Sequence, residues 1–172
     1  MKPIIFLKKR LFPFCNILLL LLSHFTVHAQ EPPPRPIAIY AQPDQGLIFG
    51  AVFLGVTGGS VTVYANGSRS VTGDITQANM GVPFSPAIFE VDANRGTLVS
   101  ILNGPDALLT GSNGGSISLH LGASDKSSPF ITTATSPGFT EVRIGGTLTI
   151  GNALANPAGA YSGTFSVTFI QE

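Results

Sequence analysis

The sequence predicts an all-β protein built of antiparallel strands. From residue 37 onward, apolar residues recur at every second position and β-branched residues are frequent. Glycine, proline, asparagine and aspartate interrupt this pattern at short intervals, as they do at turns between strands. The spacing gives about nine short strands, and this number is typical of a sandwich or a barrel.

The chain begins with the features of a secretory signal peptide. The basic residues come first: Lys2, Lys8, Lys9 and Arg10. An apolar run over residues 11–22 follows, and then Val27-His28-Ala29, with small residues at the two positions that a signal peptidase reads. We therefore expect residues 1–29 to be removed and the protein to be exported to the periplasm, the cell surface or the extracellular space.

A membrane anchor and a lipid anchor are the alternatives for this N-terminal stretch. Pro13, Asn16 and Ser23 leave only residues 17–22 uninterrupted, whereas a transmembrane helix needs about 20 apolar residues. Cys15 precedes the end of the apolar run, whereas a lipid-acceptor cysteine should follow it at the cleavage site. We expect no membrane span after cleavage.

The exported chain differs in composition from the whole sequence. Its nine acidic and five basic residues give a formal net charge of −4, so it lacks the basic surface that nucleic-acid binding requires. It has no cysteine, which excludes disulfides. Residues 30–41 form a Pro-rich segment that should be extended, because proline fixes φ and removes backbone donors. The β-domain then covers residues 42–172.

The expected strands follow from alternation and from the turns between them. In chain order they cover residues 37–41 and 47–53 and the stretches around residues 61, 71, 88, 100, 118, 143 and 165. The clearest is the last, because apolar and hydroxylated residues alternate over 161–169. Asn66-Gly67 predicts a hairpin turn, and so does the stretch 92–96. Gly145-Gly146 predicts a bulge or the close approach of another backbone.

No catalytic, cofactor-binding or metal-binding residue emerges from the sequence. The exported chain has one histidine, His120, on a strand whose apolar face is Ile117, Leu119 and Leu121, so His120 should point to solvent. The glycine clusters at 55–59 and 111–115 lack the Lys-Ser/Thr ending of a phosphate-binding loop. We expect a protein that is not an enzyme, without a cofactor or a small-molecule substrate.

Two stretches carry a family resemblance. Residues 144–150 (IGGTLTI) and 157–168 (PAGAYSGTFSVT) resemble the bacterial family named domain of unknown function 4402. Residues 85–91, and 61–63 with their Asn66-Gly67 turn, look like its earlier strands. The likeness spans roughly residues 42–172, and its specific part is the Gly-x-Tyr-x-Gly-x-Phe-x-Val ending. The resemblance implies an exported, immunoglobulin-like β-sandwich and brings no catalytic or binding residues with it.

The same ending is similar to the C-terminal strand of pilus subunits that a chaperone and an usher assemble. Gly159 is fourteenth from the end, and alternating apolar residues follow it as in those subunits. The sequence departs from the pilus pattern at Gln171, where those subunits have a tyrosine, and it lacks their cysteine pair. This similarity implies a pilin-like strand.

The resulting hypothesis is an exported structural or adhesive surface protein that is fimbria-like. Residues 35–41 would add as a strand to the open sheet edge of a neighbour, either another copy or another surface subunit. Residues 37–41 could instead pair within their own domain. The alternatives are a monomeric module that binds a glycan or a protein through loops 74–86, 103–115 and 122–140, and a small outer-membrane barrel.

Overall fold

The computed structural model describes residues 35–41, 46–135 and 137–172. The predicted signal peptide and residues 30–34 of the Pro-rich segment lie outside the described residues. The described ranges contain eleven strands: β1 (Ala38–Ala41), β2 (Ala51–Val63), β3 (Arg69–Ala78), β4 (Ala87–Asp92), β5 (Leu98–Asn103), β6 (Ala107–Gly111), β7 (Ser116–Ser124), β8 (Phe130–Ile131), β9 (Thr140–Ile150), β10 (Tyr161–Ser162) and β11 (Val167–Gln171). Among these residues, none belongs to a helix with the length and apolar character that crossing a membrane demands.

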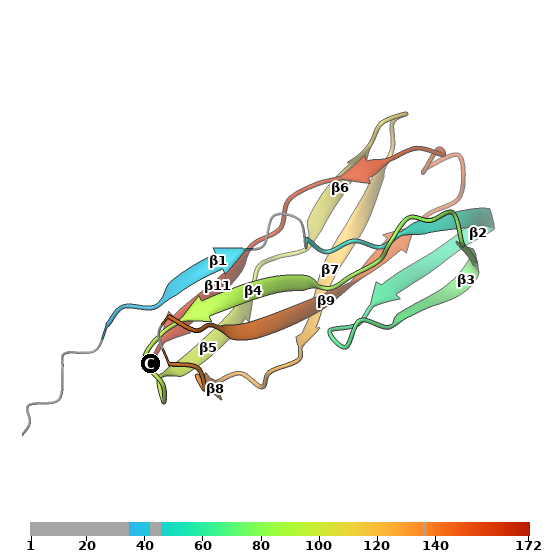
Figure 1. Cartoon of the computed structure of the whole chain (residues 1–172). Coiled ribbons are helices and arrows are strands. Elements are labelled where there is room, and N and C mark those ends of the chain that lie inside the picture. The colour runs from blue at the N-terminus through green and yellow to red at the C-terminus, as the bar shows by residue number, and fades with distance from the viewer. Residues whose placement is uncertain (1–34, 42–45, 136) are drawn as a thin grey trace, which may run out of the picture. The chain divides into compact units, whose positions relative to one another are not determined.

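The strands form two antiparallel sheets that face each other as a sandwich (Figure 1). The large sheet has the order β1-β4-β9-β7-β6-β10, and the β2–β3 hairpin pairs with β9 through β2. The small sheet has the order β11-β5-β8. Only β2–β3 and β6–β7 are pairs of consecutive strands, and the chain crosses between the two sheets several times, as in an immunoglobulin-like sandwich. The predicted fold class is confirmed.

Several strand boundaries differ from the prediction. The strands expected at 47–53 and around 61 are one strand, β2, because the glycines between them form an irregularity in the pairing with β3 and not a turn. The Asp74 carboxylate stabilises this irregularity by accepting hydrogen bonds from the backbone N–H groups of Val56 and Thr57. The sequence prediction missed β6 and β8. In β6 two leucines are consecutive, and only Leu109 faces the core.

The two predicted hairpins have different outcomes. Asn66-Gly67 does join β2 to β3: the Gly67 N–H donates to the Tyr64 carbonyl at 2.9 Å, and Gly67 has a φ of 83°. The turn at 92–96 also forms, but the hairpin prediction was wrong. The chain crosses there from β4 in the large sheet to β5 in the small sheet, so these two strands do not pair.

The last predicted strand is divided between the two sheets. Residues Tyr161 and Ser162 pair with β6, whereas Val167–Gln171 pair with β5. The change of partner interrupts the ladder over residues 163–166. From Phe165 to Gln171 the residues alternate in exposure, as the sequence pattern predicted, whereas Gly163 is exposed like its two neighbours.

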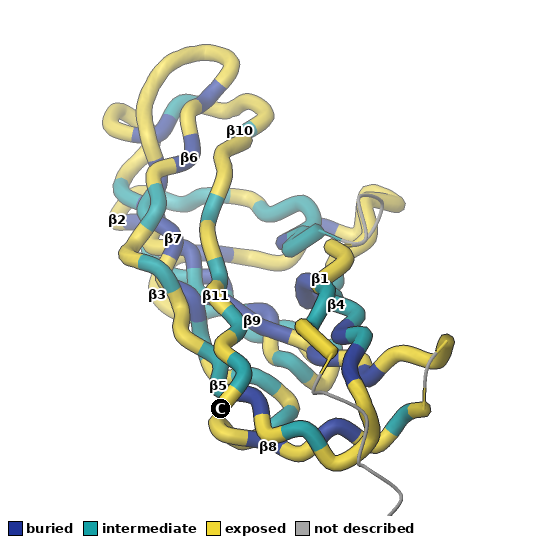
Figure 2. Tube along the Cα trace, turned by 90° about the vertical axis from the view of Figure 1, so that its left-hand side faces the viewer, coloured by how far each residue is buried: buried dark blue, intermediate teal, exposed yellow. Residues whose placement is uncertain are grey.

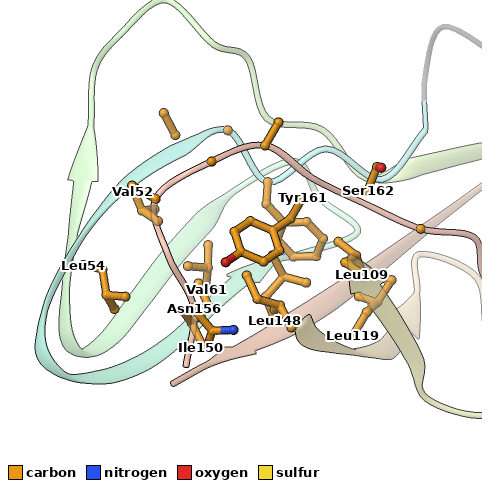
Figure 3. A pocket seen from close by; sticks show the side chains of 18 of the residues that line it. Val52, Leu54, Val61, Leu109, Leu119, Leu148, Ile150, Asn156, Tyr161 and Ser162 are labelled. Carbon is orange, nitrogen blue, oxygen red and sulfur yellow. The ribbon is translucent and has the colours of Figure 1, made fainter. Parts of the chain in front are cut away.

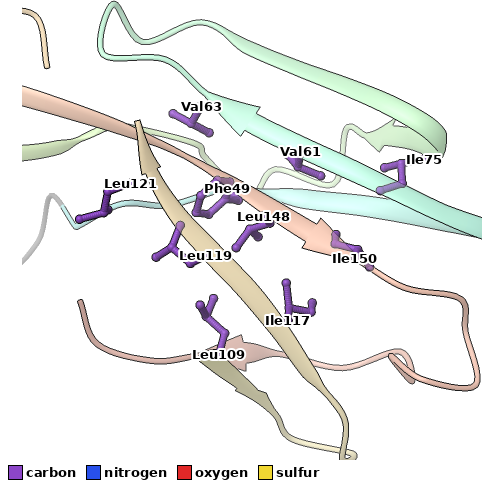
Figure 4. Close-up of a cluster of buried hydrophobic side chains, with 10 residues drawn as sticks. All are labelled: Phe49, Val61, Val63, Ile75, Leu109, Ile117, Leu119, Leu121, Leu148 and Ile150. Atoms are coloured by element: carbon purple, nitrogen blue, oxygen red, sulfur yellow. The ribbon is translucent and has the colours of Figure 1, made fainter. Parts of the chain in front are cut away.

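The core consists of two clusters of buried side chains. The first packs against β2, β6, β7 and the second half of β9 and comprises Phe49, Val61, Val63, Ile75, Leu109, Ile117, Leu119, Leu121, Leu148 and Ile150 (Figure 4). The second packs between β4, β5, β8 and the first half of β9 and comprises Val91, Ala93, Val99, Phe130, Val142 and Ile144. The small sheet lies over the second cluster, so this cluster is more completely covered than the first. Its residues Val99, Val142 and Ile144 are 0% exposed. Figure 2 shows how burial varies along the chain.

Candidate functional site: an open strand edge beside an apolar groove

The outer edge of β11 carries backbone groups that point away from the small sheet. In the antiparallel β5–β11 pair, Gly104 N–H donates to the Ser166 carbonyl at 2.9 Å and Glu172 N–H donates to the Leu98 carbonyl at 3.1 Å. Hydrogen-bonded pairs alternate along such a ladder, so the even-numbered residues of β11 bond to β5. The N–H and C=O groups of Val167, Phe169 and Gln171 therefore point outward. Among the described residues, no strand pairs with them.

The side of β5 that faces away from β11 is covered along its length. There β5 pairs with the two-residue strand β8, and beyond that pair Ser128 takes the place of a strand. The Ser128 hydroxyl accepts the Ile101 N–H at 2.8 Å and lies 3.1 Å from the Ile101 carbonyl, to which it donates. The Asn103 side chain also donates to the Gly122 carbonyl at 2.9 Å. Exposed strand edges promote association with other chains, so the outer edge of β11, the longer of the two edge strands of the small sheet, is the candidate site.

An apolar groove with a volume of about 880 Å³ lies next to the segment that leads into β11. One wall is the stretch 47–54, and the other is the stretch 153–165 (Figure 3). The floor is the first core cluster, including Leu109, Leu148 and Ile150. Val167 is the one residue of the small sheet that packs against the first cluster among the described residues, so this cluster is covered mainly by these two walls.

The groove has a described lining that is mostly apolar and carries no charged side chain. Its two largest polar side chains have partners within the fold: Asn156 accepts the Gly151 N–H and donates to the Ser116 carbonyl, and the Tyr161 hydroxyl donates to the Pro157 carbonyl at 2.7 Å. The groove is therefore suited to apolar side chains and offers few polar groups to orient a polar small molecule.

His120 points to solvent, as the sequence predicted, but it has a partner that the sequence did not indicate. Its Nδ1 lies 2.7 Å from the Asp106 carboxylate, its register neighbour beyond the end of β6, and both side chains are mostly exposed. No group of three or more histidine, cysteine, aspartate or glutamate side chains that could hold a metal ion occurs in the part of the chain that the structure describes. The pair is an exposed surface interaction with little expected stabilising effect.

We expected the glycine clusters at 55–59 and 111–115 to be loops between strands, and the structure confirms this for one of the two. Gly114 and Gly115 do lie in the turn between β6 and β7, and both have a positive φ. Gly55, Gly58 and Gly59 lie within β2 and not in a loop, so that prediction was wrong. The close backbone approach predicted at Gly145 is confirmed, because a Cβ there would lie 2.4 Å from the Val63 carbonyl oxygen. The expected irregularity is on the paired strand β7, between Leu121 and Ser124.

The sequence prediction did not find the groove or the outward groups of β11. Alternation at 161–169 identified which side chains face the core, but it carries no information about which side of a strand has a partner. The apolar residues of the stretch 47–54 carried a partial signal, since the alternation of Leu47 and Phe49 shifts by one residue before Val52 and Leu54. All four nevertheless contact the first core cluster.

The fold and the site define a class: an immunoglobulin-like sandwich whose last strand lies at an edge of the small sheet. The family model described as domain of unknown function (DUF4402) matches residues 39–170. The chain belongs to this family, which confirms the family resemblance seen in the sequence. No curated protein and no solved structure matches the chain.

Proline substitutions distinguish the two edges of β11. We expect Ile170→Pro to lower the free energy of unfolding by about 1 to 3 kcal/mol, because it leaves the Ser100 carbonyl without its partner. Gln171→Pro removes an N–H that points outward, so it should lower the free energy of unfolding by less than about 1 kcal/mol. Urea unfolding followed by circular dichroism measures both values. Equal losses of unfolding free energy in the two variants would show that the outward N–H groups of β11 already have hydrogen-bond partners within the folded domain.

Proposed function

We propose that this chain is an exported, non-enzymatic structural or adhesive surface protein that is fimbria-like and assembles by β-strand addition. The observation that carries the proposal is the open edge of β11 beside the apolar groove. Its partners would be other copies of the chain or other surface subunits. The predicted signal peptide supports export.

Strand addition would satisfy both features of the site at once. An extended peptide lying along β11 would exchange hydrogen bonds with the outward N–H and C=O groups of Val167, Phe169 and Gln171. To enter the groove, the peptide would have to continue past β11 along residues 161–165, which line the groove; its side chains would there cover the exposed side of the first core cluster. The stretch that resembles pilus subunits, 159–169, runs along this same site, which supports a fimbria-like role.

The monomeric binding module receives less support from the arrangement of the loops. The turn that joins β6 to β7 lies at one end of β7, whereas the connection that leads to β8 begins at the other end. The turn at 112–115 and the connection that begins at residue 122 therefore lie at different ends of β7. Only the start of the first loop, at Asn103, lies beside the second loop, where its side chain donates to the Gly122 carbonyl.

Light scattering after size-exclusion chromatography tests the proposal on the protein that lacks residues 1–29. We expect mass to increase with protein concentration. Phe165→Lys should abolish the increase, because it places a charge in the apolar groove. Leu108→Lys is the matched control, since Leu108 is 67% exposed, outside the groove, and the substitution should leave assembly unchanged. A protein that stays monomeric at every concentration would contradict the proposal.

A further inference from the structure

The groove between the stretches 47–54 and 153–165 is deep and has a recessed floor. Its volume of about 880 Å³ lies in the usual range of small-molecule sites, which is about 300 to 1,000 Å³. On the floor, Leu109, Leu148 and Ile150 are only 9%, 6% and 7% exposed. A ligand that reaches this floor must therefore be slender enough to pass between the two walls.

Small residues in the wall 153–165 leave room for the groove. Five of its lining residues have no side chain beyond Cβ, namely Ala153, Ala158, Gly159, Ala160 and Gly163. The hydrogen bonds of Asn156 and Tyr161 described above hold this wall in place from within the domain. The groove is therefore pre-formed, as ligand sites usually are.

The other wall belongs to β2, which bends at residues 55–58 (Figure 3). These four residues stand opposite the single residue Asp74 of β3, and such a bulge bends a strand. The Asp74 carboxylate holds the bend by accepting two of its backbone N–H groups. Before the bend, Val52 and Leu54 line the groove and pack against the first core cluster. Both walls are thus positioned by contacts of the domain itself.

The lining favours an aliphatic ligand. None of the described lining residues is charged, and most of them are valine, leucine, isoleucine, phenylalanine, alanine or glycine. A polar group that entered the groove would lose its hydrogen bonds to water and find few new partners. At the rim, Phe53 is 60% exposed and Val82 is 50% exposed, so the apolar surface continues from the floor to the solvent.

From this depth, shape and lining we infer that the groove binds a linear aliphatic chain, such as that of a fatty acid or the tail of a lipid. The chain lies between the two walls on the aliphatic floor, and its polar end stays in solvent. The inference goes beyond the proposed function, because no residue of β11 lines the groove. A peptide that continued past β11 along residues 161–165 would cover the same space, so the peptide and the chain exclude each other.

Titration with cis-parinaric acid, a linear fatty acid that fluoresces in apolar surroundings, tests the inference. The sample is the protein without residues 1–29, at concentrations where light scattering shows only monomers. We expect a saturable rise in fluorescence that dodecanol, an uncharged chain, reverses by displacing the probe. Dodecanoyl lysophosphatidylcholine below its micelle concentration separates the two sources of such a chain. It displaces the probe if a lipid tail enters the groove, and it leaves the probe bound if only a free chain fits.

Val52→Glu should weaken probe binding by about tenfold or more, because it places a charge in the apolar groove. Val52→Trp should weaken binding as strongly by filling the space, and it keeps the test valid if Val52→Glu does not fold. Val56→Glu is the matched control, since Val56 lies on the same strand, is 83% exposed and does not line the groove. Circular dichroism checks that each variant is folded.

The outcomes separate this inference from the proposed function. Binding that is lost in the Val52 variants and kept in Val56→Glu supports the inference. Equal weakening in the variants at both positions overturns it. If the probe does not bind while the protein assembles at higher concentration, this inference fails and the proposed function stands. If the probe binds but the protein stays monomeric at every concentration, the proposed function fails and this inference stands.

Discussion

Replacing Ile144 by alanine is expected to lower the free energy of unfolding by about 2 to 5 kcal/mol, the usual cost of deleting a buried isoleucine side chain. Ile144 lies at the centre of β9, where it is 0% exposed and is the largest fully buried side chain of the second core cluster. The small sheet covers this cluster, so the surrounding side chains have little freedom to fill the resulting cavity. Urea unfolding followed by circular dichroism measures the loss.

Ile131→Ala is the matched control for this prediction. The residue type is the same, but Ile131 lies on the edge strand β8 and is 60% exposed. We expect the control to lose less than about 1 kcal/mol, because little apolar surface is removed from the core. Similar losses for the two variants would contradict the description of the second cluster as the covered part of the core.

Gly145→Ala is the second substitution with a large expected effect, a loss of about 3 kcal/mol in the free energy of unfolding. A Cβ at this position would lie 2.4 Å from the Val63 carbonyl oxygen and 2.9 Å from the Ala65 nitrogen. Both atoms belong to the backbone, so relief requires the end of β2 to move away from β9. Chemical denaturation measures the change.

Gly122→Ala separates this crowding from the general effect of adding a methyl group. Gly122 lies on β7, and the nearest atoms to a Cβ there are 3.6 Å away, which is an ordinary van der Waals contact. Replacing glycine by alanine at an unstrained position reduces the entropy of the unfolded chain, so we expect a change within about 1 kcal/mol of zero. A large loss of unfolding free energy in Gly122→Ala and none in Gly145→Ala would contradict the close approach of Gly145 to the backbone at the end of β2.

The fold class could be predicted because alternation and turn residues act locally. Asn66-Gly67 specifies a tight turn by its own backbone preferences, so the β2–β3 hairpin followed directly from the sequence. The turn at 92–96 has similar residues, yet the chain there changes sheets. Which strand pairs with which depends on contacts between distant residues, and local turn chemistry does not encode them. The sequence prediction missed β6 because its two consecutive leucines break the alternation: Leu109 faces the core, whereas Leu108 points to solvent.

The candidate site could not be predicted because an open edge is a property of neighbouring strands and not of the strand itself. The sequence of Val167–Gln171 is compatible with a partner on either side. The groove likewise arises because the small sheet ends before it covers the first core cluster. The first strand was easier to find, because Ile37 and Ile39 alternate directly after the Pro-rich spacer, and β1 pairs with β4 of its own domain.

β9 passes through both halves of the core, and this has a consequence for the motions of the domain. Val142 and Ile144 belong to the covered cluster, and Leu148 and Ile150 belong to the cluster beneath the groove. Opening of the groove therefore breaks contacts at one end of β9 while the other end keeps its packing. We therefore expect slower amide hydrogen exchange at Val142 and Ile144 than at Leu148 and Ile150.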